Sequence, residues 1–399
     1  MQVVVVGAGP AGCIAAEALA ARGARTILIE KDLGRDKACA GGIPSLVVEE
    51  FGIPQEILER TFNVVHFIGP SLVRVPMRFP KGMYMATVNR RKFDGYLLKR
   101  AQAATVITVS GRFMEYEAGS RLKVRYKTDD GTIYTAFADF IIGADGAMSR
   151  VGFQTFGTNL PQVAAMQEEF KLDKTSLSHF YDHSEFYYAS RISPDYYGWI
   201  FPHADTIALG VGTTYEHADK LEDYLAELKR INGSFLSGAK SAGRSAAVIP
   251  KAMYAAPGKG NVLLCGDAAG FVLPGCGEGI FFAMESGRRA AKAILEAPRK
   301  GYSDAVRKYG EGLKEDYGPI FDYFKHVEKI AFKDDGTRET FVRVLRDTTL
   351  GTHVLKVFAL KKKENRPLLW KVKTALQLFF LRRMARRYIE GGHDILPEK

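Results

Sequence analysis

The sequence predicts an α/β fold, in which a parallel sheet is interrupted by a β-rich segment and followed by a helical C-terminal region. Three observations predict this fold. The chain opens with an apolar strand, a glycine turn and an Ala-rich helix over residues 2–21. A second strand–turn–helix unit, "GNVLLCGDAAG" followed by "GEGIFFAMESGRRAAKAIL", lies near residues 260–295. Residues from about 160 to 250 favour strands, so this segment is expected to be inserted between two parts of one domain.

The first unit, "QVVVVGAGPAGCIAAEALAARGARTILIEK", predicts strand, tight turn, helix and second strand. Its turn matches GxGxxG, and Glu30 ends the second strand, where an acidic side chain can bind ribose hydroxyls. Together these features predict a Rossmann-type dinucleotide site, with a glycine turn in a plain α/β unit as the alternative. The residues expected to bind the cofactor here are Gly7, Gly9, Pro10, Ala11, Gly12, Glu30 and Lys31.

Two later stretches favour FAD over NAD as the cofactor. "IIGADGAMSR" places Asp145 after a strand, and "LLCGDAAGFVLPGCGEGI" places Asp267 at a strand end, where it can bind a ribityl hydroxyl. A helix starting near Gly279 would direct its positive end at the flavin edge that gains negative charge on reduction. The cofactor-binding residues expected from these stretches are Asp145, Gly266, Asp267, Gly277, Gly279 and Ile280.

The remaining elements complete the expected domain organisation. Helices are expected at "NRRKFDGYLLKRAQ" and "KLEDYLAELKRI", with short strands between residues 106 and 134. Residues 1–155 and 251–300 are expected to form the Rossmann-type FAD-binding domain, with interleaved strands in its first part. Residues 156–250 are expected to form a β-rich, mixed-sheet substrate-binding domain, and residues 301–399 a helical, basic C-terminal region.

The composition excludes several functional classes. The 399 residues are 46% hydrophobic and 25% charged, as in a globular protein. Residues 353–399 carry twelve Lys and Arg against four Asp and Glu, hence +8 of the net charge of +11. The main body is therefore not expected to bind nucleic acid. The four cysteines lack disulfide or zinc spacing, so no metal site and a reduced, cytoplasmic environment are expected.

Neither end of the chain predicts a membrane-spanning segment. "MQVVVVGAGPAG" lacks a basic region and a cleavage site, so no signal peptide is expected, and no apolar run reaches 18 residues. The tail "LKKKENRPLLWKVKTALQLFFLRRMARRYIE" interleaves cations with Trp, Phe and Leu. This composition favours peripheral membrane contact. The alternative is a helix packed on the body with a solvated basic face.

The motifs GxGxxG, "GADG" and "GDAAG", in this order, resemble those of the flavoproteins related to p-hydroxybenzoate hydroxylase. In that group an Arg before an "xxFD" helix, here Arg90, contacts FAD. The chain resembles the geranylgeranyl reductases more specifically, over roughly residues 1–330. That family has a Cys-Gly-rich loop, matched by "KACAGGIP", whose Cys39, Ala40 and Gly41 are implied to lie at the flavin. Its PxxYxWxFP signature is matched by Pro194, Tyr197, Trp199, Phe201 and Pro202.

Within this family the chlorophyll and bacteriochlorophyll branch is the most similar, through its loop and the segment "EEFGIP". Ala38 replaces the usual Pro of the branch, Ala40 a Gly, and Gly42 an Ala. The resemblance implies an FAD-dependent reductase that saturates isolated C=C bonds of a geranylgeranyl chain, with NADPH as reductant. The substrate would be geranylgeranyl diphosphate or a geranylgeranyl ester of (bacterio)chlorophyll.

The aromatic signature is expected to bind this isoprenoid substrate. Alternate side chains of a strand share one face, so Tyr197, Trp199 and Phe201 would form one apolar wall. The alternative is that they only fill the core beneath a sheet. An unpolarised alkene also needs a proton donor, for which Cys39 and Tyr197 are the catalytic candidates. Cys39 as a small buried side chain is the alternative, and a redox pair with Cys276 is not favoured.

Three other functions use the same motifs. A flavin-dependent monooxygenase shares the scaffold, an archaeal-type reductase would act on geranylgeranyl ether lipids, and a pigment or isoprenoid carrier would keep only a vestigial flavin fold. Cys13 and Cys265 are interpreted as packing residues. The sequence makes no prediction of oligomeric state.

Overall fold

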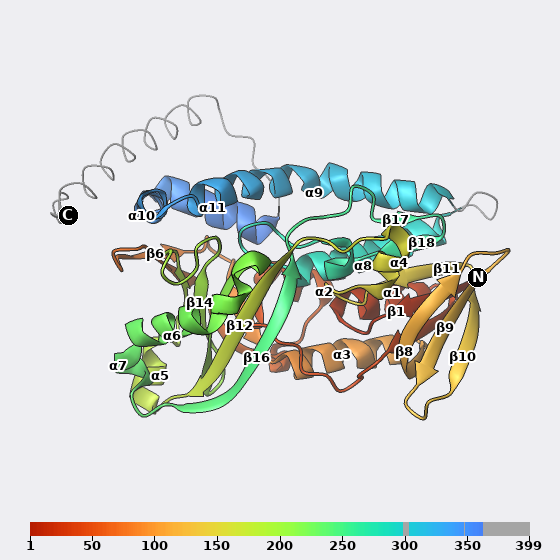
Figure 1. Ribbon diagram of the computed structural model, residues 1–399, viewed down its shortest axis with the longest axis horizontal. Helices are drawn as coiled ribbons and strands as arrows, with labels where there is room; N and C mark the ends of the chain where they lie inside the picture. The colour runs from red at the N-terminus through yellow and green to blue at the C-terminus, as the bar shows by residue number, and fades with distance from the viewer. Residues whose placement is uncertain (298–302, 347, 362–399) are drawn as a thin grey trace.

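The computed structural model describes residues 1–297, 303–346 and 348–361, which form two large sheets and a small one, covered by helices (Figure 1). The first sheet has the order β10-β9-β8-β2-β1-β11-β18-β17. Its strands are β1 (Gln2–Val6), β2 (Arg25–Glu30), β8 (Ile107–Glu117), β9 (Leu122–Thr128), β10 (Ile133–Ala138), β11 (Phe140–Gly143), β17 (Gly258–Lys259) and β18 (Val262–Leu264).

The centre of the first sheet is parallel and fully buried. β1 pairs with β2 on one side and β11 on the other, with Val3 opposite Phe140. β11 then pairs with β18, which comes from the second motif-bearing segment. The four valines of β1 are buried, as expected for a strand covered on both faces. The predicted Rossmann-type sheet, completed by a distant part of the chain, is thereby confirmed.

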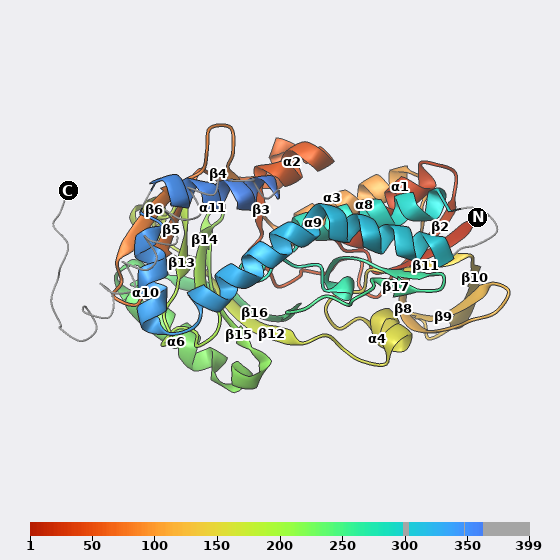
Figure 2. The same cartoon turned by 90° about the horizontal axis from the view of Figure 1, so that it is seen from above.

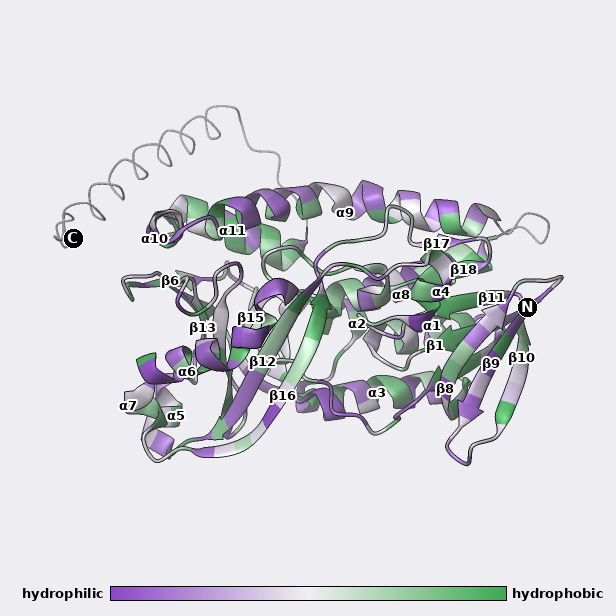
Figure 3. Cartoon of the chain, in the orientation of Figure 1, coloured by the Kyte–Doolittle hydropathy of each residue, from purple (hydrophilic) through white to green (hydrophobic). Residues whose placement is uncertain are grey.

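Helices cover this sheet and connect its strands. α1 (Pro10–Ala20) packs between α3 (Arg90–Ala103) and α8 (Ile280–Leu295). The other helical elements before α8 are α2 (Ser45–Phe51), α4 (Arg150–Phe156), α5 (Lys174–His179), α6 (Leu221–Ile231), α7 (Gly233–Leu236) and the 3-10 helices η1 (Gln55–Ile57), η2 (Tyr215–Lys220) and η3 (Gly266–Ala269). In Figure 3, β11 and β18 are hydrophobic, whereas α9 alternates between hydrophobic and hydrophilic turns.

The second sheet has the order β16-β12-β15-β14-β13-β5-β6. Its strands are β5 (Val64–Ile68), β6 (Arg74–Arg78), β12 (Gln162–Lys171), β13 (His183–Tyr187), β14 (Gly198–Pro202), β15 (Thr206–Thr214) and β16 (Lys240–Pro250). β13 and β5 run parallel, and the other neighbours are antiparallel. β5 and β6 lie outside the 156–250 segment that the sequence assigned to the substrate-binding domain. A third sheet joins β3 (Gly42–Pro44), β7 (Met85–Val88) and β4 (Leu58–Phe62).

The long helix α9 (Ser303–Ala331) spans both large sheets, and Figure 2 shows it crossing from the first toward the second. α10 (Asp335–Val344) and α11 (Thr348–Leu360) follow it over the second sheet. Among the described residues no helix is both long and apolar enough to cross a membrane. Most of the basic tail, residues 362–399, lies outside the described residues.

The two faces of the second sheet pack in two separate cores. Trp199 and Phe201 share one core with Phe67 and with side chains of α10 and α11. Ile200, between them in β14, belongs to the other core, beneath α6. The alternation along β14 therefore places its aromatic side chains on the face toward α9–α11.

Candidate active site

The glycine turn after β1 is shaped by close backbone contacts. A Cβ at Gly7, whose φ is +102°, would lie 2.3 Å from the Ala144 carbonyl oxygen, and one at Gly12 would lie 1.8 Å from the Gly7 oxygen. Only glycine fits at either position. α1 therefore begins directly against the strand, with Gly9 as its N-cap and no acidic side chain in its first turn. Its free N–H groups form an anion-binding end.

A cavity of about 440 Å³ opens beside this turn and extends to the second sheet. The predicted cofactor residues that line it are Gly9, Pro10, Ala11, Cys39, Ala40, Gly41, Arg90, Asp145, Gly266, Asp267, Gly277, Gly279 and Ile280. The predicted substrate residues Tyr197, Trp199 and Phe201 line the same cavity. The two groups of motifs, far apart in the sequence, thus meet at one space.

Four predicted cofactor residues do not line the cavity. Gly7 and Gly12 hold the turn against its neighbours, as described above. Glu30 is buried, and its carboxylate accepts hydrogen bonds from the backbone N–H groups of Ala8 (2.7 Å) and Asp32 (3.2 Å). Lys31 is exposed on the surface. A ribose contact by Glu30 stays a prediction.

Two ion pairs fix charged side chains at the cofactor end of the cavity. Lys37 Nζ lies 2.8 Å from Asp267 Oδ2. Burial alone would raise the pKa of Asp267, but the charge of Lys37, with those of Arg90 and Arg35, holds this pKa below its ordinary value. Arg90 forms two hydrogen bonds to Asp94, at 3.0 and 2.8 Å, although both side chains are buried. Such a bidentate pair fixes the guanidinium rigidly.

Asp145 and Glu278 cap the helices that begin at the cavity. The Asp145 carboxylate accepts hydrogen bonds from Ser149 Oγ and two backbone N–H groups at the start of α4, while burial raises its pKa. Glu278 Oε1 accepts from the Phe281 N–H in the first turn of α8. Its other oxygen lies 2.8 Å from Lys361 Nζ, and both side chains are almost fully buried. The acidic cap of α8 is thus neutralised by a lysine from the end of α11.

The aromatic wall is continuous along the substrate end. Tyr196 and Tyr197 stack at 4.5 Å between ring centroids, and the Trp199 indole meets Tyr197 edge-on at 5.9 Å. Tyr197 donates a hydrogen bond to the Cys276 carbonyl at 2.6 Å, while burial raises the pKa of its hydroxyl well above the ordinary value. The indole lies over Gly210, where a Cβ would come within 2.4 Å of it. Glycine at this position of β15 makes room for the indole.

The thiols differ in their surroundings. Cys39 is half-buried on the cavity wall, and its Sγ accepts from the Gly41 N–H at 3.4 Å. Cys276 lines the cavity as well, and its Sγ points to the Leu273 carbonyl. Cys13 and Cys265 are buried in the core of the first sheet. All four are free thiols.

The structure adds lining residues that the motifs did not indicate. Lys37 stands two positions before Cys39, so its place in the loop was a usable signal. Glu328 and Phe332 come from α9 and the residues after it, Phe341 from α10 and Phe358 from α11. These helices carry no motif, and only their fold over the second sheet brings their side chains to the cavity.

Glu328 gives a testable pH dependence. Burial raises the pKa of its carboxyl above the ordinary value, so the folded protein favours the protonated form. Ionised Glu328 therefore destabilises the folded state. The free energy of unfolding is unaffected at low pH and falls as the pH rises through the raised pKa. Glu328→Gln is expected to raise the thermal unfolding temperature more at about pH 8 than at about pH 4. Equal shifts at both pH values would contradict this.

The cavity fits FAD. An Arg35 guanidinium nitrogen lies 2.6 Å from where a Gly9 Cβ would stand, so the bare backbone and a cation meet at the start of α1. That combination suits a pyrophosphate, which Gly9 and Ala11 would hold with Arg35. Asp267 can accept a hydrogen bond from a ribityl hydroxyl, and the glycines before α8 leave space for a planar ring.

Fold and cavity together define an FAD-dependent oxidoreductase, and the sequence pattern of the FAD binding domain family matches residues 1–312. The chloroplastic geranylgeranyl diphosphate reductase of Oryza sativa subsp. japonica is 34% identical over 365 residues, covering 87% of this chain and 78% of that protein. The chain belongs to the geranylgeranyl reductase family.

Two further comparisons extend this relationship. A digeranylgeranylglycerophospholipid reductase of Methanocaldococcus jannaschii is 29% identical over 380 residues, covering 89% of this chain and 93% of that protein. A crystal structure of a geranylgeranyl bacteriochlorophyll reductase-like protein from Thermoplasma acidophilum has a TM-score of 0.75 and 21% identity, with 95% of each chain covered. The latter likeness bears on the fold alone.

Proposed function

We propose that this enzyme reduces isolated C=C bonds of a geranylgeranyl chain, with NADPH as the electron source. The observation that carries the proposal is the single cavity that joins the glycine turn at Gly9 to the aromatic wall at Trp199. Geranylgeranyl diphosphate or a geranylgeranyl ester of (bacterio)chlorophyll is the proposed substrate. A geranylgeranyl ether lipid is the second candidate, favoured by the similarity to the archaeal lipid reductase.

The side chains of the cavity suit an uncharged polyprenyl chain. Such a chain offers no charge or hydrogen bond along its length, so apolar contact must hold it, at about 25 cal/mol per Å² buried. Tyr197, Trp199 and Phe201 provide this contact on one side, and Phe332 and Phe358 line the same space from the helical side. The same surfaces exclude water from the reacting alkene.

FAD, when bound and reduced, supplies a hydride. A proton must also reach the alkene, because an isolated C=C bond is not polarised and does not accept a hydride unaided. Cys39 and Tyr197 are the proposed donors, since both line the cavity. The Tyr197 hydroxyl donates its proton in a hydrogen bond to the Cys276 carbonyl. This bond fixes the position of the hydroxyl, but it must break before the proton can be transferred to the substrate. Cys39 has the more open environment and is the preferred donor.

The decisive test is mass spectrometry of the products after anaerobic incubation with NADPH and one substrate at a time. Geranylgeranyl diphosphate, a geranylgeranylated chlorophyll and a geranylgeranyl ether lipid are compared. We expect mass gains of two hydrogens per step without oxygen, and the preferred substrate identifies the branch. In a parallel incubation in air, a product that contains an added oxygen atom and is absent from the anaerobic sample would identify a monooxygenase instead. In the same assay Cys39→Ala and Tyr197→Phe separate the two donors, and full turnover by both variants would exclude them.

A further inference from the structure

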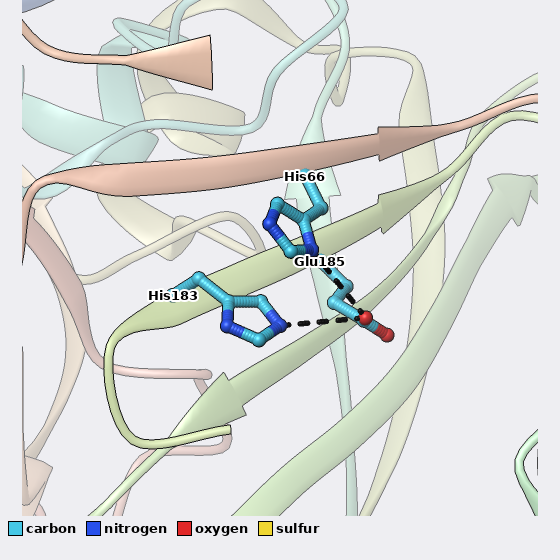
Figure 4. Close-up of side chains that lie close together, drawn as sticks. All are labelled: His66, His183 and Glu185. Carbon is cyan, nitrogen blue, oxygen red and sulfur yellow. Dashed lines mark ion pairs between the residues drawn. The ribbon is translucent and has the colours of Figure 1, made fainter. Parts of the chain in front are cut away.

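A second group of polar side chains lies within the second sheet, on the face away from the cavity. It consists of His66 on β5 and of His183 and Glu185 on β13, shown in Figure 4. β5 and β13 are parallel neighbours, and His66 stands opposite Glu185 in their register. The adjacent Phe67 and Phe186 line the cavity, so strand alternation directs the polar group to the other side.

His183 and Glu185 are buried, His66 is half-buried, and the ligand atoms of the three side chains converge. Glu185 is fully buried and His183 is 5% exposed. His183 Nε2 lies 3.5 Å and His66 Nδ1 3.9 Å from the same oxygen, Glu185 Oε1. All three atoms lie within 4.8 Å of one another. Among the described residues, neither of these two nitrogens has a hydrogen-bond partner.

The tautomer of His183 makes this arrangement unusual. Its Nδ1 lies 2.8 Å from the carboxylate of Asp182, a side chain that is exposed to solvent. An ionised carboxylate only accepts, so Nδ1 carries the proton and Nε2 presents a lone pair. That lone pair faces the carboxylate oxygen of Glu185. Two acceptors that face each other in a buried site repel unless positive charge lies beside them, and in this structure the Arg74 guanidinium, paired with Glu185 Oε1, supplies that charge.

The two imidazole rings stack on each other, with 3.9 Å between their centroids. Neutral imidazole is the form in which histidine binds metals.

We propose that Glu185, His183 and His66 form a Zn²⁺ site between β5 and β13. Two imidazoles and a carboxylate are a ligand set that zinc commonly takes, with bonds of about 2.0–2.2 Å and ligand atoms therefore roughly 3.4 Å apart. The distances to Glu185 are close to this spacing, and the half-buried His66 ring turns to complete it. Asp182 orients His183 as outer carboxylates orient metal-binding histidines.

Arg74 is the competitor for this site. Its guanidinium, on the neighbouring strand β6, pairs with Glu185 Oε1 and is about one-third exposed. Tyr187 holds the other carboxylate oxygen with a hydrogen bond of 2.5 Å. Zinc therefore takes the place of Arg74, which swings to solvent while the carboxylate stays in place. Removing the Arg74 guanidinium is therefore expected to strengthen zinc binding, whereas removing a ligand is expected to weaken it.

The experiment measures Zn²⁺ binding to the full-length, FAD-loaded protein after treatment with a chelator, by isothermal titration and by metal analysis after dialysis. Wild type is expected to bind one equivalent. His183→Ala and His66→Ala should each weaken binding at least 100-fold, and Arg74→Met should tighten it about tenfold or more. His326→Ala, which changes an exposed histidine on α9, is the matched control and should leave the affinity unchanged.

Co²⁺ substitution separates this site from binding by the free thiols. Cobalt held by His66, His183 and Glu185 should show visible absorption without a thiolate charge-transfer band, and the visible bands should disappear in His183→Ala. Circular dichroism and flavin absorption report whether each variant is folded. If a histidine variant does not fold, His66→Gln, a milder change at the more exposed ligand, is used in its place. The proposal is overturned if neither wild type nor Arg74→Met binds zinc, or if the histidine variants bind it as wild type does.

Discussion

Trp199→Ala is expected to lower kcat/KM for the geranylgeranyl substrate by about 70-fold while FAD stays bound. The indole forms the middle of the aromatic wall, and its loss removes on the order of 100 Å² of apolar contact. At roughly 25 cal/mol per Å² this costs about 2.5 kcal/mol, which corresponds to the stated factor. Steady-state kinetics under anaerobic conditions measure it, and flavin absorption confirms that the cofactor is retained.

Gly210, over which the Trp199 indole lies, provides a second test of the aromatic wall. In Gly210→Ala the new methyl group would come within 2.4 Å of the indole, so it should displace the ring and lower kcat/KM without truncating any side chain. Gly233→Ala places its methyl group where nothing lies within 4 Å and should behave as wild type. Unchanged kcat/KM in both Trp199→Ala and Gly210→Ala would show that the substrate does not lie along this wall.

The second large effect is expected on stability. Asp94→Ala leaves the Arg90 guanidinium, only 4% exposed, without its bidentate partner. Removing one member of a buried ion pair costs about 3–5 kcal/mol, because a charge then remains desolvated and uncompensated. Urea unfolding with saturating FAD should show this loss in the free energy of unfolding.

Two further variants test the cause. Asp94→Leu combined with Arg90→Met removes both charges and should recover most of the stability, since an apolar pair of similar volume is tolerated at such sites. Glu117→Ala, whose ion pair with Lys123 lies on the surface, should change stability much less. A small loss in Asp94→Ala itself would mean that Arg90 reaches another partner or water.

Sequence patterns predicted those parts of the structure in which a short segment determines its own geometry. The turn at Gly12 is such a segment, because a Cβ there would meet the Gly7 oxygen of the same strand–turn–helix unit. The close contact at Gly7 comes instead from the distant Ala144, but the GxGxxG pattern marks that position as well. The alternation of Trp199 and Ile200 between two cores follows in the same way from the period of a strand. The Rossmann-type sheet was predictable because both of its motif-bearing segments carry this local information.

Contacts between distant segments were not predictable by the same reasoning. The neutralisation of Glu278 by Lys361 depends on where α11 ends, and α11 carries no motif. His66 and Glu185 meet only because β5 joins β13, and nothing in residues 64–68 indicates that they pair with residues 183–187. Cysteine and histidine spacing predicted no metal site, and spacing along the chain carries no information on the proposed ligands, which come from separate strands.

The chain passes repeatedly between the two large sheets. β5 and β6, early in the sequence, belong to the second sheet, and α9, late in the sequence, spans both. Neither large sheet is therefore formed by one continuous segment of the chain. Grafting residues 156–250 onto another flavoprotein would omit β5 and β6 of the second sheet and the helices α9–α11, which line the cavity. We therefore expect substrate specificity in this scaffold to change more readily through single side chains along the aromatic wall than through transfer of residues 156–250.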